Sequence, residues 1–434
     1  MDSTRTWRFL RTAFTMAAIT FSLALCVSAQ TEAVLHTFGG VGDGGYVNAG
    51  LTFGPDGSLY GTAPYGGDAN CGCGVVFKLT PTSTGGWAET KLHVFTGGRD
   101  GVYPSGTVTF DAVGNLYGAT AGGLSTGNCN FHACGTVFEL SPTANGGWRL
   151  TTLHTFIGTD GGDVNGGLIF DSGGNLYGST FIGGTGTCFS ILACGTVFRL
   201  SPTSTGGWKL TTLHDFTIEK DGVFPSSLVM DAAGNLYGTT VQGGTNTCLS
   251  GTCGTVFELS PTSSGAWNKT TLYNFTFGAD GEFPYAGLVM DSAGNLYGTT
   301  WVGGKYGCLP LTGCGVVFEL SQTSSGVWSE TVLHSFIGKG GDGGSPTSSV
   351  IFGPNGNLYG TASGGGLYGY GTVFELSPSS NGAWKETVLY SFRGAPNDGL
   401  VPASGVIFDA AGNLYGTTFN GGAYNEGVAY RITP

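Results

Sequence analysis

Charge is scarce in this sequence. Only 10% of the 434 residues are Asp, Glu, Lys or Arg, the formal net charge is −12, and Lys and Arg nowhere form a cluster. Such a chain does not attract the phosphates of nucleic acids or of anionic membranes, so we expect neither as a partner. The sequence also lacks a nucleophile elbow, a His-Glu-x-x-His pair and a phosphate-binding loop, so no common catalytic motif points to an enzyme.

Helical periodicity is also absent, since no segment after the first 29 residues repeats apolar side chains every three to four positions. Glycine is abundant instead, with 82 copies, but there is no Gly-X-Y period, which excludes collagen. Aromatic residues make up 12% of the chain, too many for a sequence that cannot form a core. The glycines recur at fixed places, which indicates turns that need positive φ.

The sequence is built from a repeat centred on residues 235–240, Asn-Leu-Tyr-Gly-Thr-Thr. Near-copies start at Ser58, Asn115, Asn175, Asn295, Asn357 and Asn413, with spacings of 57, 60, 60, 60, 62 and 56 residues. Within one repeat, β-branched and aromatic residues alternate over residues 226–231, 235–240, 255–260 and 267–275, and turn residues separate these runs. Each repeat therefore predicts a four-stranded antiparallel meander.

Seven such repeats predict an all-β fold, a seven-bladed β-propeller. Residues 33–38 match the fourth run of a repeat, whereas the last repeat stops after its third run at residues 427–432. In a closed ring the N-terminal strand completes the last blade and removes an exposed sheet edge. The alternatives are a β-solenoid, which needs terminal caps, and a two-domain arrangement. We expect a single propeller over residues 30–434.

The recurring G-N-L-Y-G-T-T, C-G-T-V-F-E-L-S-P and L-H-x-F elements resemble the GloVer tandem-repeat family of bacteria, over essentially all of residues 31–434. The resemblance implies a secreted or surface protein of unknown activity, and it supplies no catalytic residues. Some members carry a C-terminal anchor segment, which the end of this sequence at Pro434 does not match. The P-x-x-G-L-V-F-D-x-x-G-N-L-Y pattern, which covers the first and second runs of a repeat, also resembles the corresponding hairpin of NHL-type propellers, but more weakly.

The N-terminus is typical of an export signal. Arg5, Arg8 and Arg11 precede an apolar run over residues 12–27, and Val27-Ser28-Ala29 offers small residues for cleavage after Ala29. We predict a signal peptide over residues 1–29 and a secreted, periplasmic or cell-surface protein. The alternatives are an uncleaved anchor and, less well matched because Leu25 precedes Cys26, a lipoprotein signal.

Ten cysteines form five local pairs between the second and third runs of a repeat. In an exported chain close pairs predict disulfides, and the rival zinc site needs four ligands that converge on one point. The predicted pairs are Cys71 with Cys73, Cys129 with Cys134, Cys188 with Cys194, Cys248 with Cys253, and Cys308 with Cys314.

Three residue types recur at equivalent places and point to structure. His36, His93, His154, His214 and His334 share a position with Tyr273 and Tyr390, which favours packing and hydrogen bonding between blades over metal binding. An Asp-Gly pair precedes each repeat and predicts a turn. Calcium binding is an alternative there, with Asp160, Asp163 and Asn165 closest to a ligand set. Otherwise we expect no metal and no cofactor. The recurring Trp is expected to pack on the blade rim.

An asymmetric ligand would bind where the repeat varies. The residue after each Thr-Thr differs, and the fifth blade is richest in unusual side chains, namely Glu282, Tyr285, Trp301, Lys305 and Tyr306. These are our candidate ligand-binding residues; the alternative is that loop residues vary without function. We expect a monomeric, non-catalytic binding or structural module for a glycan or protein. The alternative is a polysaccharide-acting lyase or glycoside hydrolase with Glu219 and Glu282, both expected at the loop surface, as its acids.

Overall fold

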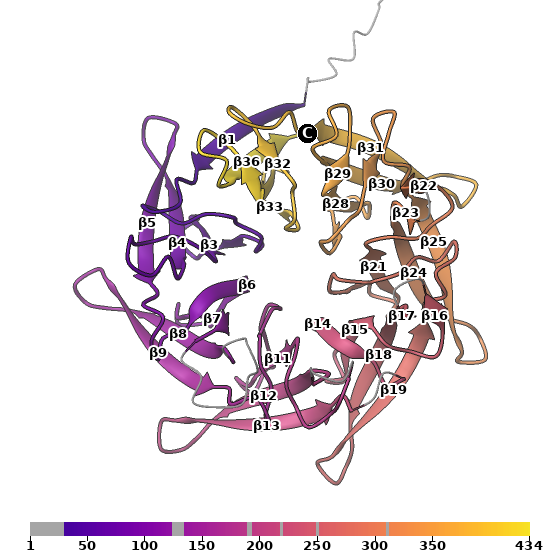
Figure 1. The fold of residues 1–434 in the computed structure, drawn as a ribbon, viewed down its shortest axis with the longest axis horizontal. Coiled ribbons are helices and arrows are strands. Elements are labelled where there is room, and N and C mark those ends of the chain that lie inside the picture. The colour runs from indigo at the N-terminus through magenta and orange to yellow at the C-terminus, as the bar shows by residue number, and fades with distance from the viewer. Residues whose placement is uncertain (1–29, 124–133, 189–192, 218–219, 249–250, 310–311) are drawn as a thin grey trace, which may run out of the picture.

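The computed structural model describes residues 30–123, 134–188, 193–217, 220–248, 251–309 and 312–434. Within these residues the strands form seven four-stranded antiparallel sheets around a central axis, and the predicted seven-bladed propeller is confirmed (Figure 1). The first three blades are β2 (Thr52–Phe53), β3 (Leu59–Ala63), β4 (Val75–Pro81) and β5 (Trp87–Val94); β6 (Val102–Phe110), β7 (Leu116–Gly122), β8 (Thr136–Pro142) and β9 (Trp148–Thr155); and β10 (Ile169–Phe170), β11 (Leu176–Thr180), β12 (Thr196–Pro202) and β13 (Trp208–Asp215).

The remaining four blades follow the same order from the axis outward. They are β14 (Val223–Met230), β15 (Leu236–Gln242), β18 (Thr255–Pro261) and β19 (Trp267–Asn274); β20 (Val289–Met290), β21 (Leu296–Thr300), β24 (Val316–Gln322) and β25 (Trp328–Ser335); β27 (Ile351–Phe352), β28 (Leu358–Ala362), β30 (Thr372–Pro378) and β31 (Trp384–Ser391); and β33 (Ile407–Phe408), β34 (Leu414–Thr417), β36 (Val428–Thr433) and β1 (Thr31–Thr37). The described residues contain no helix long and apolar enough to cross a membrane.

The innermost strands are shorter than the sequence pattern predicts. In five blades the first strand has only two residues, whereas β6 and β14 extend over nine and eight. The segment before each of the five two-residue strands does not extend the β-ladder. Its backbone instead forms hydrogen bonds with loops of its own blade and of the preceding blade. Short two-stranded ribbons join loops on one face: β16 (Thr247–Cys248) with β17 (Gly251–Thr252), β22 (Gly307–Leu309) with β23 (Thr312–Gly313), β26 (Gly343–Gly344) with β29 (Gly364–Gly365), and β32 (Gly399–Leu400) with β35 (Asn420–Gly421).

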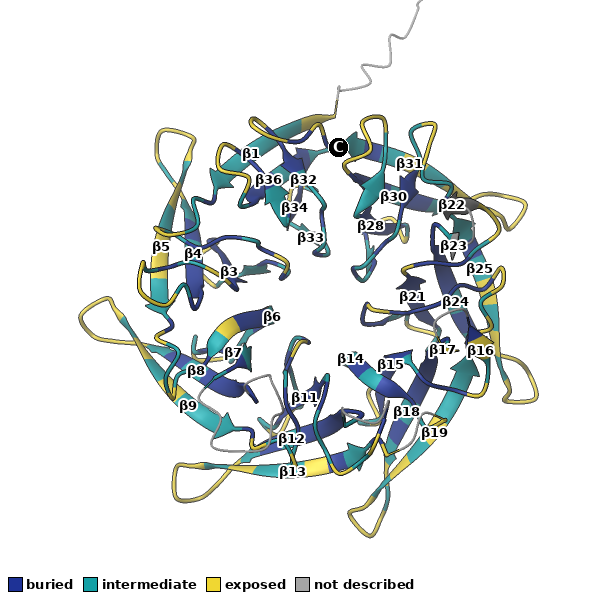
Figure 2. Ribbon diagram, in the orientation of Figure 1, coloured by how far each residue is buried: buried dark blue, intermediate teal, exposed yellow. Residues whose placement is uncertain are grey.

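The repeated Asn-Leu-Tyr-Gly-Thr-Thr segment is the second strand of each blade, and successive residues serve different neighbours. Leu236 packs with Phe216 of the preceding blade, whereas Tyr237 packs with Leu288 of the following one. The glycine is required because a Cβ at Gly118 would lie 2.5 Å from the ring of Phe138. The strand therefore buries both of its faces (Figure 2).

Aromatic pairs fasten each blade to the next. The Phe after each fourth strand packs against the ring in the third strand of the next blade, with centroids 5.0–5.5 Å apart at all seven interfaces. The recurring Trp also packs between blades, as when Trp148 meets Tyr60 of the preceding blade at 6.3 Å. Buried aromatic pairs contribute about 0.5–1.5 kcal/mol each beyond their area.

The ring closes through its two ends. Strand β1 pairs antiparallel with β36 from Thr31 opposite Thr433 to Thr37 opposite Val428, and the Phe38 amide donates to the Gly427 carbonyl at 3.0 Å. The N-terminal strand thus completes the last blade, as the unequal ends of the sequence predict. Pairing with β1 covers the edge of β36 that the last blade would otherwise expose.

Candidate functional site at the channel mouth

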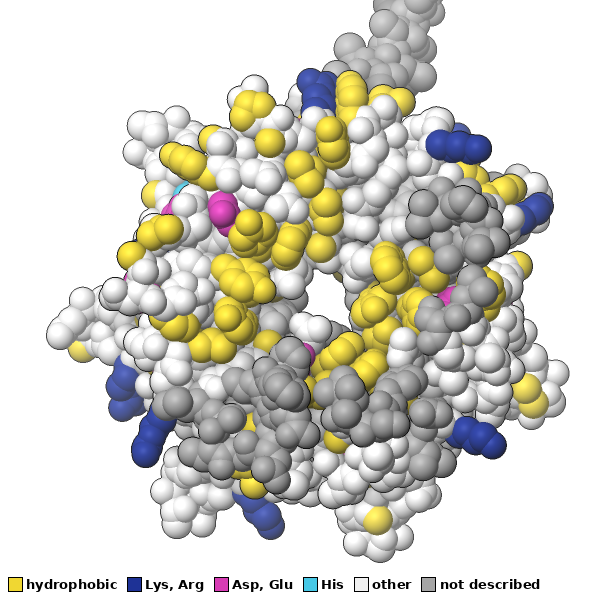
Figure 3. Space-filling model, in the orientation of Figure 1, with side chains coloured by type: hydrophobic (Ala, Val, Ile, Leu, Met, Phe, Trp, Pro, Cys, Tyr) yellow, Lys and Arg dark blue, Asp and Glu magenta, His cyan; other side chains and the backbone are white. Residues whose placement is uncertain are grey.

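The loops that enter each blade and the loops that hold the cysteine pairs lie on the same face. In the fifth blade, for example, the Glu282 amide, before the first strand, donates to the Val302 carbonyl, after the second, at 2.9 Å. Figure 3 shows this face, with hydrophobic side chains around the central opening and Lys and Arg side chains at its periphery. An apolar, weakly charged surface therefore surrounds the axis.

Each blade contributes one residue to this opening from an unusual backbone conformation. Three positions after the entry Asp, a non-glycine residue has φ between 55° and 62° in all seven blades: Tyr46, Tyr103, Asp163, Phe224, Phe283, Ser345 and Val401. Non-glycine residues rarely adopt this left-handed region, and it is uncommon for aromatic side chains. The surrounding bonds hold it there, since the Phe283 amide donates to the Cys253 carbonyl of the preceding blade and the Phe283 carbonyl accepts from the Trp301 amide.

The aromatic members of these seven positions, together with residues from the loops that follow the second strands, form two aromatic arcs beside the opening. In the first arc, Tyr46 lies 5.1 Å from Phe419 and 5.6 Å from Tyr65, which lies 5.1 Å from Tyr103, all between ring centroids. In the second, Phe181 and Phe224 stack at 4.5 Å, and Val241 and Phe283 pack beside them. The sequence pattern identified the positions after Thr-Thr but gave no sign of the left-handed positions beside them.

Tyr285 and Trp301 end the second arc at the channel itself. Their rings meet edge to face at 5.7 Å between centroids, with 42% of Tyr285 and 38% of Trp301 exposed. The residues equivalent to Tyr285 in the other blades are Asn, Ser, Thr or Ala, so the fifth blade alone places an aromatic ring there. Burial raises the pKa of the Tyr285 hydroxyl, which keeps it a neutral donor and acceptor at physiological pH.

Below the arcs lies a central channel of about 640 Å³, lined by the innermost segments of all seven blades. Its described wall is uncharged, and its polar lining includes Asn48, Thr107, Asn165, Ser227, Thr347 and Ser349. None of the described residues that line the channel is Asp, Glu, His, Lys or Arg. The channel therefore offers amide and hydroxyl groups without charge.

The five candidate residues of the fifth blade do not form one site. Tyr285 and Trp301 lie at the channel, whereas Lys305 and Tyr306 line a separate hollow of about 890 Å³ between the fifth and sixth blades. Glu282 is only 1% exposed, so the expectation of a surface carboxylate there is wrong. Its position is Gly, Val or Leu in the other blades, and burial alone raises the pKa of Glu282 to about 7. Glu219 lies outside the described residues.

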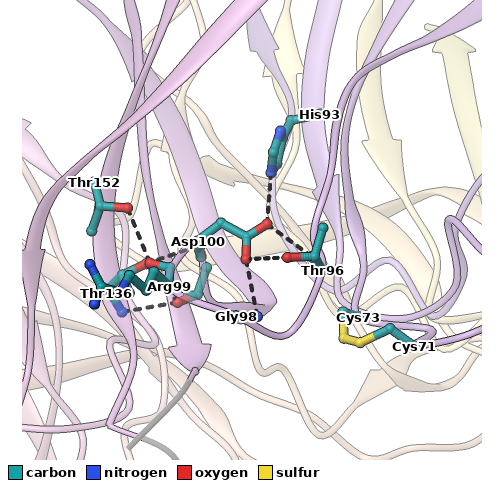
Figure 4. A network of polar contacts seen from close by, with 10 residues as sticks. Cys71, Cys73, His93, Thr96, Gly98, Arg99, Asp100, Thr136 and Thr152 are labelled. Atoms are coloured by element: carbon teal, nitrogen blue, oxygen red, sulfur yellow. Dashed lines mark hydrogen bonds and ion pairs between the residues drawn. A yellow bond between two sulfur atoms is a disulfide. The ribbon is translucent and has the colours of Figure 1, made fainter. Parts of the chain in front are cut away.

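The recurring His or Tyr and the entry Asp are hydrogen-bonded to each other in every blade. The distances are 2.8–3.2 Å from the His Nε2 or Tyr hydroxyl to the carboxylate. Figure 4 shows one pair, in which Asp100 also accepts from the Thr96 amide and hydroxyl and from the Gly98 amide. These bonds, led by the Thr96 hydroxyl, outweigh burial and lower the pKa of Asp100. The pair organises the turn that leads into the next blade.

The possible calcium ligands each have a place in the fold of the third blade. Asp160 accepts from His154 and from the Ile157 amide, Asp163 occupies a left-handed position of the arcs, and Asn165 lines the channel.

The cysteine loops carry disulfides. The structure joins Cys71 to Cys73, Cys188 to Cys194, and Cys248 to Cys253. Cys134 and Cys314 are also disulfide-bonded, and their expected partners, Cys129 and the side chain of Cys308, lie outside the described part of the chain.

A family model of the Gloeobacter/Verrucomicrobia repeat matches residues 20–192, 130–336 and 309–434, and these matches together span the propeller. The chain belongs to this family. The expected relationship to the GloVer repeat proteins is therefore confirmed. Comparison with curated proteins gives no match, so this family relationship brings no characterised activity with it.

Solved structures similar to this member of the Gloeobacter/Verrucomicrobia repeat family share its fold at low identity. They include a gluconolactonase from Xanthomonas campestris (15% identity, 76% of this chain and 86% of that one, TM-score 0.41) and a luciferin-regenerating enzyme (14%, 93% and 95%, 0.46). A third is the extracellular domain of a putative one-component system from B. thetaiotaomicron (9%, 93% and 40%, 0.53), of which this chain spans less than half. At these identities the likeness concerns fold alone.

Proposed function

We propose that the protein is an exported, non-catalytic binding module that holds a neutral glycan at the mouth of its central channel. The observation that carries this proposal is the meeting of Tyr285 and Trp301 above a channel whose described lining is uncharged. Binding sites combine apolar walls with a few polar groups that fix orientation. Aromatic rings over amides and hydroxyls fit this description.

A glycan matches the chemistry of this surface better than a peptide or an anion. A pyranose ring presents C–H faces that pack on aromatic rings and hydroxyls that bond to amide and hydroxyl groups. Asn48, Thr107 and Asn165 supply such groups within the channel. A charged ligand would lose its hydration there without gaining a counter-charge, which disfavours uronic acids, phosphates and charged peptide ends.

In the alternative of a polysaccharide-acting enzyme, a glycoside hydrolase requires two carboxyl groups on either side of the scissile bond. Of its two candidate acids, Glu282 is buried and Glu219 lies outside the described residues. None of the described residues that line the channel is Asp, Glu or His, so this surface favours binding over hydrolysis.

Export rests on the N-terminal sequence. Arg5, Arg8 and Arg11 precede an apolar run that ends in a small-residue cleavage motif. Cleavage after Ala29 would leave β1, which begins at Thr31, intact for ring closure. The N-terminal sequence of the protein recovered from the exterior of producing cells tests this point, and recovery only inside the cells would contradict it.

A glycan array and pull-down with insoluble neutral and acidic polysaccharides, followed by a search for released fragments, test the binding function. We expect retention on a neutral glycan without release of soluble fragments. Released fragments would favour the enzyme. Binding to acidic glycans alone, or to no glycan, would overturn the proposal.

A further inference from the structure

A second ring of sites lies between the blades, away from the channel. At each interface the entry Asp of a blade lies beside one position in the fourth strand of the same blade, as Asp221 does beside Lys269. The seven residues at this position, in ring order from the Asp43 interface, are Glu89, Leu150, Leu210, Lys269, Glu330, Glu386 and Glu32. Four interfaces therefore bring two carboxyl groups together, and one brings a carboxylate to an ammonium.

The repeat itself shows that this position accepts a cation. At the fourth blade the Lys269 ammonium lies 3.0 Å from the Asp221 carboxylate and also donates to the Asp221 backbone carbonyl. At two of the Glu interfaces burial raises the pKa of the Glu and a nearby basic side chain offsets part of this rise, namely Lys91 for Glu89 and Arg393 for Glu32. Two of the four interfaces with paired carboxyl groups thus have a Lys or Arg nearby.

The interface of Asp342 and Glu386 has a histidine in place of such a charge. His334 Nε2 lies 3.2 Å from Asp342 Oδ1 and 4.0 Å from Glu386 Oε2, and one ligand atom from each residue lies within 4.8 Å of the others. No Lys or Arg among the described residues forms an ion pair with either carboxyl group. Donor atoms around a tetrahedral zinc ion lie about 3.3 Å apart, so this spacing is close to a ligand set.

One donor at this interface has no partner in the described structure. Glu386 Oε1 is buried and forms no hydrogen bond with any described residue. The hollow lined by Lys305, Tyr306 and these three residues connects the cluster to solvent.

We propose that His334, Asp342 and Glu386 bind a divalent transition-metal ion, zinc in the first instance, between the fifth and sixth blades. One imidazole and two carboxylates form a three-ligand set that zinc accepts, with water in the fourth position. Calcium takes oxygen ligands only and six or more of them, so this site discriminates against it. The ion would link the two blades in addition to their apolar packing and to hydrogen bonds such as that from the Thr299 hydroxyl to the Ser348 carbonyl.

Titration of chelator-treated full-length protein with zinc chloride by calorimetry tests the site. We expect one equivalent to bind, calcium chloride to give no binding, and zinc to raise the unfolding temperature. Loss of an outer-shell partner weakens metal binding about 10–100-fold, so loss of a ligand in Glu386→Gln or His334→Tyr should weaken it at least as much. Tyr is the natural alternative at position 334, as Tyr273 and Tyr390 show, so the second variant keeps the bond to Asp342.

The equivalent positions between the fourth and fifth blades supply a control variant and a variant that should gain zinc binding. Glu330→Gln alters a carboxyl pair that has Tyr273 in place of histidine, so zinc affinity should not change. Tyr273→His places a histidine beside Asp280 and Glu330 and should add a second equivalent of zinc. Absence of zinc binding in the wild type, or undiminished affinity in His334→Tyr, would overturn the proposal.

Discussion

The hydroxyl of Thr417, in the last blade, donates a hydrogen bond to the backbone carbonyl of Ala49, in the first, at 3.0 Å. Equivalent bonds cross five of the other six interfaces, as from Thr239 to Ala286 at 3.0 Å and from Thr361 to Ser404 at 2.8 Å, and the second blade has Ala119 at this position. The first Thr of the repeated motif therefore forms a hydrogen bond between adjacent blades at the channel wall, and the Thr417 bond joins the first and last blades.

Removal of this hydroxyl should weaken ring closure. Thr417→Val leaves the Ala49 carbonyl without this donor and removes one of the bonds of the buried Ser404 hydroxyl, which should lower the free energy of unfolding by about 1–3 kcal/mol. Urea denaturation measures the difference. Thr90→Val, at an exposed position of β5, is the matched control and should have little effect. Equal stability of the two variants would contradict a contribution of the Thr417 hydrogen bond to ring closure.

The buried hydroxyl of Tyr430 offers a stabilising change. Its ring occupies the place of a Phe in the other six blades, and the hydroxyl is fully buried without a hydrogen-bond partner among the described residues. Tyr430→Phe removes this cost, so we expect a gain of about 1 kcal/mol in unfolding free energy. Phe374→Tyr, the reverse change in the sixth blade, should destabilise the protein. A less stable Tyr430→Phe variant would show that this hydroxyl has a favourable role.

Stability should fall between pH 5 and pH 8 because of buried carboxyl groups. Burial and the Asp280 carboxylate raise the pKa of Glu330 from 4.5 to about 7. The folded chain therefore holds this proton more tightly than the unfolded chain does, and the contribution is complete below pH 4.5 and lost as the pH rises to 7. With screening by solvent the loss is about 1–2 kcal/mol.

The variant Glu330→Gln isolates this effect. It should match the wild type in urea at pH 5, where both side chains are uncharged, and exceed it at pH 8. A variant that gains the same stability at both pH values would show that charge is not the cause.

The disulfide of the third blade should stabilise a loop without being needed for the fold. Cys188 and Cys194 are buried beside Phe216 and Val223, and they close a loop of six residues. Replacement of both by Ala should cost about 2 kcal/mol of stability in the chain-entropy model. Circular dichroism should remain that of the wild type, because the sixth and seventh blades have no cysteine pair. Loss of the folded spectrum would contradict this separation.

The sequence predicted the seven-bladed ring from three patterns: the spacing of the repeats, the alternation of side chains within each run, and the unequal ends of the chain. All three patterns depend on how the strands pair, and this pairing repeats from blade to blade. It placed Trp301 and Tyr285 near one face, since the strand order fixes where loops emerge. It did not separate Lys305 and Tyr306 from them, because the radial distance of a loop residue depends on packing. Nor did it show that Glu282 is buried, since the surroundings of this side chain depend on tertiary packing.

The central claim is that the channel mouth binds a neutral glycan through Tyr285 and Trp301. The most direct test is calorimetric titration of a neutral glycan selected on the array into the wild type and into Trp301→Ala, Tyr285→Ala and Tyr424→Ala. Tyr424 is exposed on a loop of the seventh blade and does not line the channel. We predict at least about tenfold weaker binding for the first two variants, which lose an aromatic anchor, and unchanged binding for the third. Equal affinity in all four proteins would contradict the account.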